Sequence, residues 1–364
     1  MRMSTVGILG AGQLGRMLAL AGLPLGLHFR FMDPFAESPA SRIAPFIPAD
    51  FSDPVALRRF AEGLSVATYE FENVPVRAAR QLEQFVPVHP APIALDKSQD
   101  RLAEKTFFAS LGVPTAEYAE VSTRAQLEAA LSRIGLPAVL KTRRLGYDGK
   151  GQFVLRSMTD IDPALKTLTG DMIVEGLVHF ERELSIIGVR NQAGEIAFYP
   201  LIQNHHRDGI LRQSVLAEET RPGLQRQAEE YARAVMSALG YVGILAIELF
   251  ERNGELIASE MAPRVHNSGH WTIDGAVTSQ FENHLRAICG LPLGSTQPLG
   301  RCAMINLIGR RPDPACILAI EGAHLHLYDK APRPGRKLGH VTVVDQDEER
   351  LKAKVNKIME HVDS

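Results

Sequence analysis

Short apolar segments alternate with helical patterns over the first hundred residues, and this alternation constrains the fold more than any other feature. The segments VGILG, HFRFMD, VATYEF and FVPVHP have the composition of buried strands, and helical patterns separate them at 13–21, after Asp53-Pro54 and at 76–84. Such alternation is typical of a doubly wound parallel sheet. We therefore expect the chain to begin with an α/β domain built on a parallel sheet.

The first strand runs directly into a glycine-rich turn. Residues 6–18 read VGILGAGQLGRML, so Gly10, Gly12 and Gly15 separate the strand from a helical segment. This order surrounds a phosphate with backbone N–H groups in dinucleotide-binding folds, and Asp33 ends the second strand near the position of the acid that contacts a ribose. This segment alone therefore leaves an NAD-dependent oxidoreductase open as a hypothesis.

Charge and cysteine content argue against several classes of protein. The chain has 364 residues, and its 40 lysines and arginines against 42 acidic residues give no general reason to expect a nucleic acid or an anionic membrane as partner. No apolar run approaches the roughly 20 residues of a membrane span, and a strand begins almost at Met1, which argues against a signal peptide. Cys289, Cys302 and Cys316 match neither a zinc site nor a disulfide framework, so we expect reduced thiols in a cytoplasmic protein.

The pattern changes after the first domain. A helix is expected in LDKSQDRLAEKTFFASLGVP, with Asp96 or Ser98 as its N-cap and Gly112 and Pro114 as its stop signal. Beyond it, short strands are joined by turns that contain glycine, such as NQAGE and RNGE. Helical patterns interrupt these strands at 223–240 and 278–290 and return at 347–361.

A second glycine-rich turn lies in LKTRRLGYDGKGQF. Gly146, Gly149 and Gly151 occupy the tip of an expected hairpin, and Lys141 ends its leading strand. The amide groups of such a loop can fold over phosphates while an ammonium neutralises them. A solvated hairpin with a basic edge is the alternative, because glycine-rich tips are common.

Two acids, Glu248 and Glu260, stand inside the apolar strand segments GILAIELF and ELIASEMAP. A buried carboxylate needs a cation, a set of donors or a proton. A two-residue turn at Asn253-Gly254 would place the acids on opposite faces of the hairpin, whereas a three-residue loop at 252–254 would place them on one face as diagonal neighbours. By this reasoning only the longer loop makes a site for octahedral Mg²⁺, and two independently paired acids are the alternative.

Two further segments concentrate polar side chains without helical or strand periodicity. APRVHNSGHW follows Glu260 directly and contains Arg264, His266, Asn267 and His270. Such a cluster fits an anion or substrate site, whereas a single histidine is more often structural. YDKAPRPGRKLGH contains four cations, Lys330, Arg333, Arg336 and Lys337. They fit a phosphate group, with a plain solvated loop as the alternative.

Together these segments resemble the ATP-grasp superfamily and, within it, the 5-(carboxyamino)imidazole ribonucleotide synthetases, which are ATP-dependent carboxylases of purine synthesis. The resemblance extends over essentially the whole chain, through GILGAGQLGRM, YEFENVP, LKTRRLGYDGKGQ, APRVHNSGHW and RPGRKLGH. It implies a chain of α/β and α+β class in three parts. These are a Rossmann-like domain at 1–99 that holds no dinucleotide, an ATP-grasp domain at 100–296 with a mobile glycine-loop subdomain at about 110–175, and a small C-terminal domain at 297–364.

The resemblance also assigns site residues. The implied ATP contacts are Arg101, Lys141, Gly146, Tyr147, Asp148, Gly149, Lys150, Gly151, Gln152, Glu175, Gly176, Leu177, Val178, Glu183, His206, Ser259 and Glu260. Among these, Glu183 would hold the ribose hydroxyls and the backbone of 175–178 the adenine edge. Glu248 and Glu260 match the carboxylates that bind Mg²⁺, for which Mn²⁺ could substitute. Ser259 departs from the asparagine that family members commonly carry there, so a shorter hydroxyl would have to reach a phosphate or water.

The remaining assignments concern the other substrates. The implied substrate-side contacts are Gln13, Glu70, Asn73, Tyr147, Asp148, His270, Lys330, Arg336 and Lys337. Arg264 and His266 would hold bicarbonate and carboxyphosphate, and Lys141 would neutralise the phosphates. The implied reaction carboxylates aminoimidazole ribonucleotide at the expense of ATP and bicarbonate, in a cytoplasmic homodimer that uses neither NAD nor biotin and binds neither nucleic acid nor membrane. The alternatives are another ATP-grasp ligase, such as a formate-dependent glycinamide ribonucleotide transformylase, an NAD-dependent oxidoreductase and a non-enzymatic nucleotide sensor.

Overall fold

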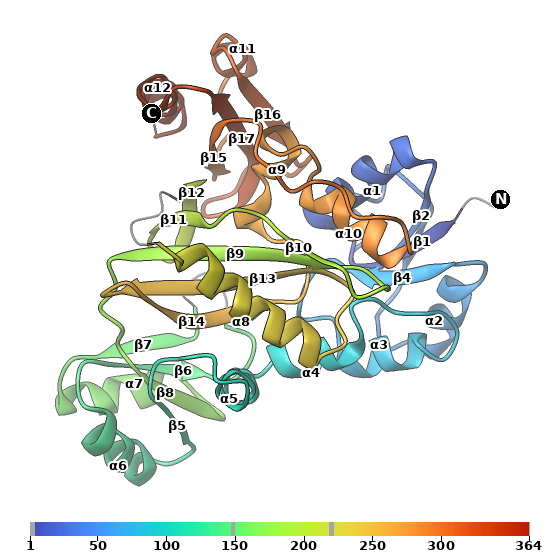
Figure 1. Cartoon of the computed structure of the whole chain (residues 1–364). Helices are drawn as coiled ribbons and strands as arrows, with labels where there is room; N and C mark the ends of the chain where they lie inside the picture. The colour runs from blue at the N-terminus through green and yellow to red at the C-terminus, as the bar shows by residue number, and fades with distance from the viewer. Residues whose placement is uncertain (1–3, 147–149, 218–221, 364) are drawn as a thin grey trace.

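Four parallel strands form the N-terminal sheet in the computed structural model, which describes residues 4–146, 150–217 and 222–363 (Figure 1). The strand order is β3 (Phe46–Pro48), β2 (His28–Asp33), β1 (Thr5–Leu9) and β4 (Val66–Tyr69). One face packs on α1 (Gln13–Gly22), which leads into η1 (Leu23–Leu25), and the other packs on α2 (Pro54–Ala61) and α3 (Val76–Leu82). The predicted parallel sheet is confirmed, but FVPVHP contributes only a single bridge, between Ala67 and Val88.

Two helices, instead of the one expected, lead out of the N-terminal domain. α4 (Pro92–Ser98) ends before α5 (Arg101–Ser110) begins, and Asp100 is the N-cap of α5. Its Oδ1 accepts hydrogen bonds from the backbone N–H groups of Leu102 and Ala103 at 3.0 and 3.3 Å. The prediction that Asp96 or Ser98 caps a single helix is therefore wrong, because Asp100 starts a new helix in a new direction.

A small antiparallel sheet forms the lobe at the lower left of Figure 1. Its order is β5 (Tyr118–Val121), β8 (Met172–Gly176), β6 (Ala138–Thr142) and β7 (Gln152–Leu155). α6 (Arg124–Ile134), η2 (Met158–Asp160) and α7 (Ile161–Thr167) complete this lobe, which has its own apolar core. The expected hairpin around the second glycine-rich turn is confirmed, since β6 and β7 pair with Lys141 opposite Gln152.

A nine-stranded sheet spans the rest of the molecule. Its order is β14 (Glu255–Ala262), β13 (Gly243–Arg252), β9 (Arg182–Arg190), β11 (Ile202–Arg207), β12 (Ile210–Leu216), β15 (Arg301–Ile308), β17 (Lys337–Asp345) and β16 (Ala323–Leu327), and β10 (Ile196–Phe198) pairs with β9. The sheet crosses the expected boundary near residue 297 without a break, because β12 pairs with β15. The C-terminal strands therefore extend the central sheet.

Helices cover both faces of this sheet. α8 (Leu224–Ala238) packs on one face of β9 and β13, and α10 (Gln280–Ile288) packs on the other together with α1. The remaining short elements are η3 (Asn267–Gly269), α9 (Thr272–Gly275) and α11 (Pro314–Leu318), and α12 (Glu348–Asp363) packs on β15 and β17. The predicted helices at 223–240, 278–290 and 347–361 are thus confirmed within a few residues.

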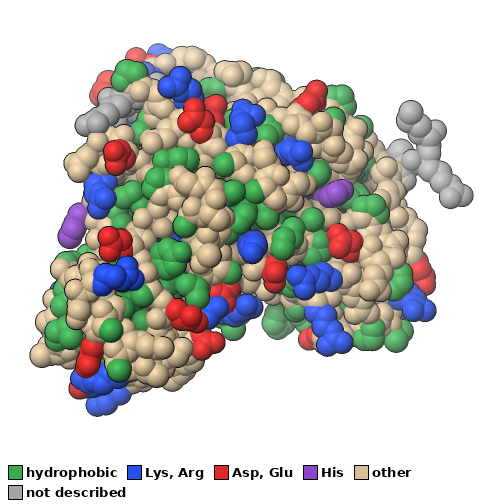
Figure 2. Space-filling view, turned by 60° about the horizontal axis from the view of Figure 1, so that its bottom comes forward, with side chains coloured by type: hydrophobic (Ala, Val, Ile, Leu, Met, Phe, Trp, Pro, Cys, Tyr) green, Lys and Arg blue, Asp and Glu red, His purple; other side chains and the backbone are tan. Residues whose placement is uncertain are grey.

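Charged side chains of both signs are interspersed over the face shown in Figure 2. This view gives no single-sign area on that face of the kind that a nucleic acid would require. Within the described ranges, no helix combines the length and the apolar character that crossing a bilayer demands. All three cysteines are free.

Candidate active site

A cavity of about 630 Å³ lies where the N-terminal domain, the small sheet and the large sheet meet. Most of the residues predicted for the site line it, namely Gln13, Asn73, Arg101, Lys141, Gly146, Lys150, Gln152, Glu175, Glu183, His206, Glu248, Ser259, Glu260, Arg264, His266, His270 and Lys337. The N-terminal domain, the small sheet and the large sheet, which are far apart in sequence, therefore contribute to one site. Tyr147, Asp148 and Gly149 fall outside the residues that the structure describes.

The other predicted residues do not line the cavity. Among the residues that the structure describes, these are Glu70, Gly151, Gly176, Leu177, Val178, Lys330 and Arg336. Lys330 is connected to the wall, because its Nζ donates a hydrogen bond to Gln13 Oε1 at 2.5 Å. Gly151 and Gly176 belong to the backbone around the second glycine-rich turn and the end of β8.

Glu248 and Glu260 stand directly opposite one another on β13 and β14. The connecting turn has two residues, Asn253 and Gly254, with φ of 53° and 73°, and Arg252 pairs with Glu255. Of the two alternatives the structure therefore has the two-residue turn, and the expectation that only the longer loop places both acids on one face is wrong. A β-bulge instead inserts Ser259 between the pairs Leu249–Ala258 and Glu248–Glu260, so the acids share a face despite the short turn.

The side-chain pattern of β14 shows the effect of this bulge. Before it, Leu256 and Ala258 pack in the core beneath α8; after it, Met261 packs there and Ala262 packs in the opposite core. Even-numbered side chains thus change face at Ser259. Because the period of a strand is two residues, one inserted residue moves every following side chain to the other face.

The carboxylates in this part of the cavity lie close to one another. Burial and the neighbouring Glu260 raise the pKa of Glu248 to about 8, and the same two causes raise the pKa of Glu104 on α5 to about 8. Among the described residues, no group of three or more His, Cys, Asp or Glu side chains has the geometry of a metal site. Two carboxylates with space beside them fit Mg²⁺, which usually keeps waters and takes phosphate oxygens as further ligands.

Two lysines and a buried acid form a cluster between the small sheet and α5. Lys141 Nζ donates to Glu175 Oε2 at 2.9 Å, and Lys105 Nζ on α5 lies 3.6 Å from the same oxygen. Burial would raise the pKa of Glu175, but Lys141 and Lys105 hold it below its ordinary value. Glu175 Oε1 is buried and has no hydrogen-bond partner among the described residues.

Glu104 and Lys105 were missed by the sequence interpretation, although both line the cavity. The helix was predicted from its apolar residues, and of these only Phe108 is fully buried. The charged residues Glu104 and Lys105 are buried as well, with 3% and 2% of their surface exposed. A signal was present, because both charged residues precede Phe108 by about one helical turn and so lie near its face.

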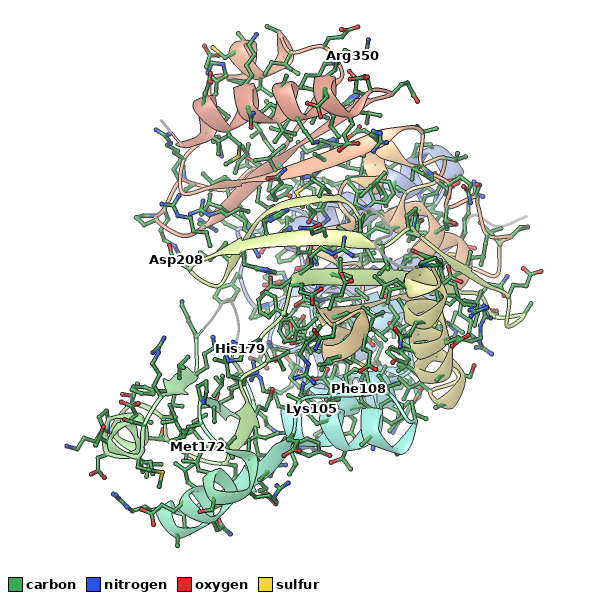
Figure 3. All side chains as sticks on the ribbon, turned by 60° about the vertical axis from the view of Figure 1, so that its left-hand side comes forward. Lys105, Phe108, Met172, His179, Asp208 and Arg350 are labelled. Carbon is green, nitrogen blue, oxygen red and sulfur yellow. The ribbon has the colours of Figure 1, made fainter. Side chains whose placement is uncertain are left out.

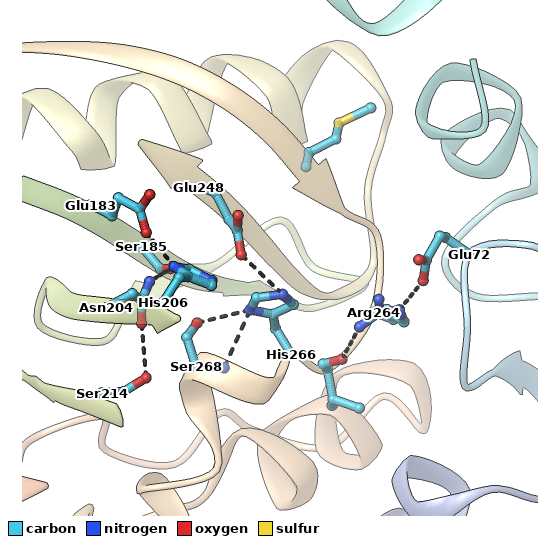
Figure 4. A network of polar contacts seen from close by, with 12 residues as sticks. Glu72, Glu183, Ser185, Asn204, His206, Ser214, Glu248, Arg264, His266 and Ser268 are labelled. Atoms are coloured by element: carbon cyan, nitrogen blue, oxygen red, sulfur yellow. Dashed lines mark hydrogen bonds and ion pairs between the residues drawn. The ribbon is translucent and has the colours of Figure 1, made fainter. Parts of the chain in front are cut away.

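Arg264 and His266 approach the cavity from the segment that follows β14 (Figure 4). Arg264 Nε donates to Glu72 Oε2 at 2.5 Å, which fixes the guanidinium, and His266 Nε2 lies 3.4 Å from Glu248 Oε1. Ser268 donates its backbone N–H to His266 Nδ1, so the network assigns the imidazole proton to Nε2. Burial and the charges of Arg264 and Lys337 hold the pKa of His266 well below its ordinary value, so the ring is neutral.

His206 and Glu183 form a second polar pair at the end of the same sheet. His206 Nδ1 contacts Glu183 Oε2, and both side chains line the cavity. Burial opposes a charge on His206, but the hydrogen bond to Glu183 raises its pKa above the ordinary value. Behind this pair, Asn204 connects Ser185 and Ser214 through hydrogen bonds of 2.6 and 2.8 Å (Figure 4).

The first glycine-rich turn is filled by side chains of the protein itself. Glu70 accepts hydrogen bonds from the N–H groups of Gly12 and Gly15, the latter at 2.6 Å, and Asp33 Oδ2 accepts from Ala11 N at 2.9 Å. A Cβ on Gly10 would lie 2.4 Å from Glu70 Cγ. The glycines therefore make room for a carboxylate in the position that a pyrophosphate takes in dinucleotide-binding folds.

The second glycine-rich turn is anchored at its base, and described residues on either side of its tip line the cavity. Arg101 donates to the carbonyl oxygens of Thr142 and Gly146 at 3.0 and 3.2 Å. Arg143 forms two hydrogen bonds with Asp100, at 3.0 and 2.8 Å, so the cap of α5 also holds this hairpin. Gly146, Lys150 and Gln152 then face the cavity.

Comparison with known proteins matches three domain families to the chain. The ribonucleotide synthetase preATP-grasp domain matches residues 3–99, the ATP-grasp domain residues 106–281 and the phosphoribosylaminoimidazole carboxylase C-terminal domain residues 302–354.

The chain is also similar to known proteins over nearly its whole length. It is 50% identical to the N5-carboxyaminoimidazole ribonucleotide synthase of Pseudomonas aeruginosa, over 97% of this chain and 98% of that protein. A crystal structure of N5-carboxyaminoimidazole ribonucleotide synthetase from Thermus thermophilus superposes with a TM-score of 0.95, 54% identity and 99% coverage of both chains. The Aspergillus clavatus enzyme, in complex with ADP and 5-aminoimidazole ribonucleotide, superposes with a TM-score of 0.92, 31% identity and 99% coverage of both chains.

Proposed function

Because the chain belongs to the N5-carboxyaminoimidazole ribonucleotide synthase family, we propose that the cavity between its two sheets carries out the carboxylation of aminoimidazole ribonucleotide. The protein is an ATP-grasp ligase of purine biosynthesis, and it uses ATP and bicarbonate and releases ADP and phosphate. The observation that carries the assignment of the site is the pairing of Glu248 with Glu260 in a cavity that also contains Lys141, Arg264 and His266.

ATP is held between the small and large sheets in this proposal. Glu183 takes the ribose hydroxyls, the segment 175–178 takes the adenine edge, and Lys141 with the amides of the second glycine-rich turn takes the phosphates. Glu248 and Glu260 hold Mg²⁺, which supplies charge neutralisation on the transferred phosphoryl group. The raised pKa of Glu248 supports this role, because a carboxylate that is buried beside another one ionises fully only beside a cation.

Arg264 and His266 bind the small anion. The Arg264 guanidinium is held by Glu72 and can donate to bicarbonate, and the neutral His266 directs its Nε2 proton toward the same region. Bicarbonate oxygen attacks the γ-phosphorus, ADP leaves, and carboxyphosphate forms. The amine of aminoimidazole ribonucleotide then bonds to the carboxyl carbon as phosphate leaves and the amine loses a proton. The protein contributes alignment and preorganised charge to both steps.

The substrate ribonucleotide lies against the N-terminal and C-terminal domains. Gln13, Asn73, His270 and Lys337 line this side of the cavity, and Lys330 is hydrogen-bonded to Gln13. Burial and, after it, the nearby charges of Arg336, Lys337 and Arg333 lower the pKa of Lys330 to about 8. Cations gathered in this way suit a ribose phosphate.

ADP formation with each substrate omitted in turn tests the proposal. We expect ADP release that requires both bicarbonate and aminoimidazole ribonucleotide. Release that requires formate and glycinamide ribonucleotide instead would support the transformylase alternative. Binding of NADH without binding of ATP would support an oxidoreductase.

Two finer features are also part of the proposal, namely a homodimer and a cytoplasmic location. The homodimer rests on the family resemblance. The cytoplasmic location rests on the three free cysteines. Burial raises the pKa of the Cys289 thiol to about 11, which keeps it in the less reactive protonated form. Light scattering coupled to size exclusion would measure the oligomeric state, and a mass equal to one chain would contradict the first feature.

A further inference from the structure

The β-bulge at Ser259 lies on β14, which is the terminal strand of the large sheet. Polar groups at such a position are incompletely paired, because a bulge interrupts the ladder on one side and an edge strand has no neighbour on the other. Side chains of α5 and the segment after it supply partners here. Ala258 N donates to Pro114 O at 2.7 Å, and Thr115 forms an isolated bridge with Ala258.

Lys105 binds the bulge from the carbonyl side. Its Nζ donates to Ser259 O at 2.7 Å and to Ala258 O at 3.3 Å. Figure 3 shows Lys105 on α5, where the lobe that contains Met172 meets the rest of the molecule. The same ammonium lies 3.6 Å from Glu175 on β8, so one buried cation connects the bulge of the large sheet to a strand of the small sheet.

Glu104 binds the bulge from the N–H side. Its Oε1 accepts a hydrogen bond from Met261 N at 2.7 Å, directly after Glu260, whereas the carbonyls that Lys105 contacts directly precede Glu260. Two consecutive residues of α5 therefore bind the backbone of β14 on both sides of Glu260. An apolar side chain at either position could fill the space but could not satisfy these backbone groups.

We propose that Glu104 and Lys105 are positioning residues that hold the bulge at Ser259, so that Glu260 rather than Ser259 stands opposite Glu248. This inference rests on the proposed function, in which Glu248 and Glu260 bind the divalent cation. Without the bulge, the two-residue turn would pair Glu248 with Ser259 and direct Glu260 to the opposite face. The helix that begins at the base of the second glycine-rich turn thus sets the geometry of the metal carboxylates.

Binding of Mn²⁺ with ADP, followed by electron paramagnetic resonance, tests this role in the full-length protein without relying on turnover. Glu104→Ala removes the acceptor for Met261 N, and Lys105→Met removes the donor to the two carbonyls while keeping the length of the side chain. We expect each to weaken Mn²⁺ binding in the presence of ADP at least about tenfold, as substitutions of residues that orient metal ligands typically do. Wild-type affinity in both variants would overturn the inference.

Glu104→Gln separates positioning from direct metal binding. The amide oxygen can still accept from Met261 N, so we expect this variant to bind Mn²⁺ within about threefold of wild type. A loss as large as that of Glu104→Ala would overturn the positioning role, because it would mean that the negative charge itself binds the metal. Thr106→Ala, at an exposed position of the same helix, is the matched control and should bind normally.

Circular dichroism of each variant establishes whether it folds. If Lys105→Met does not fold, the comparison of Glu104→Ala with Glu104→Gln decides the question alone. The outcome for the proposed function is separate. If the wild-type protein shows no Mn²⁺ binding with ADP, the assignment of Glu248 and Glu260 fails. If wild type binds and the α5 variants bind equally well, only the inference about Glu104 and Lys105 fails.

Discussion

The two glycine-rich turns of this protein each contain three glycines after a strand, but they differ in which groups contact them. At the first turn, the carboxylates of Glu70 and Asp33 accept hydrogen bonds from the backbone N–H groups of Gly12, Gly15 and Ala11. At the second, Arg101 and Arg143 anchor the base of the hairpin. The described residues on either side of its tip, Gly146 and Lys150, line the cavity. A glycine turn can therefore serve the fold at one place and a ligand at another.

Residues distant in sequence decide between these two outcomes. Glu70 follows β4 and lies 58 positions from Gly12, so the first turn is occupied only once the parallel sheet has formed. Among the described residues at the second turn, Asp100 accepts hydrogen bonds from the side chains of Arg143 and Arg144, and Glu175 accepts one from Lys141. Whether a glycine-rich turn offers N–H groups to a phosphate thus depends on which carboxylates the fold brings to it.

The largest expected effect concerns the second turn and the metal carboxylates. Lys141→Ala and Glu260→Ala should each lower the rate of ADP formation by roughly 10²–10³-fold or more, because charge stabilisation in a closed site is the main contribution that the protein makes. The far-UV circular dichroism should be unchanged. Near-native turnover in either variant would contradict the role assigned to that residue.

A substitution at the first glycine-rich turn, which Glu70 occupies, should lower the stability of the fold. Glu70→Ala leaves the N–H groups of Gly12 and Gly15 without their acceptor, and we expect the free energy of unfolding in urea to fall by about 1–3 kcal/mol. Glu70→Gln should lose less, because the amide oxygen can still accept one of the two bonds. Binding of NADH to the wild-type protein would break the comparison, since it would mean that the first turn is open to a dinucleotide.

A pH profile tests the cations that lie next to the first turn. Burial and the neighbouring Arg336 lower the pKa of Lys330 to about 8, so the ammonium is charged below that pH and neutral above it. If Lys330 binds the substrate phosphate, KM for aminoimidazole ribonucleotide should rise up to about tenfold between pH 7 and 9. Lys330→Arg should remove this rise, because guanidinium stays charged. A wild-type profile that is flat over this range would contradict the role.

The smallest expected effect concerns the anchor of the second turn. Burial opposes ionisation of Asp100, but its hydrogen bonds to Arg143 hold its pKa below the ordinary value of 3.8. A depressed carboxyl pKa stabilises the fold above the unfolded-state value, and this contribution is lost as the pH falls through the folded-state value. Asp100→Asn should lower Tm by roughly 2 °C at pH 7, and the gap should close as the pH falls through the lowered folded-state pKa of Asp100. A gap that does not change with pH would contradict this account.

Much of the architecture was predictable from local patterns. Strand and helix alternation predicted the parallel sheet, glycine turns predicted the β6–β7 hairpin, and the helical pattern at 223–240 matches α8. Residues with the chemistry of the site were also identified, from Lys141 to Lys337, because charged residues within apolar or irregular segments are conspicuous in a sequence. Their separate roles in the reaction stay predictions.

The two residues missed at the site share one physical cause. Glu104 and Lys105 act on partners elsewhere in the chain, namely Met261 and the carbonyl of Ser259. The two-residue turn at Asn253-Gly254 was one of the two alternatives considered, and by itself it would place Glu248 and Glu260 on opposite faces. The bulge that returns them to one face is hydrogen-bonded to a helix some 150 positions earlier. No local pattern contains that information.

The sequence by itself determined the order of strands and helices and the stock of charged groups, since these follow from side-chain periodicity and backbone propensity over a few residues. Only the tertiary structure decided the face on which Glu260 lies and the occupant of the first glycine-rich turn. Both depend on polar groups that must find partners once they are buried, and those partners are chosen by the packing of distant elements.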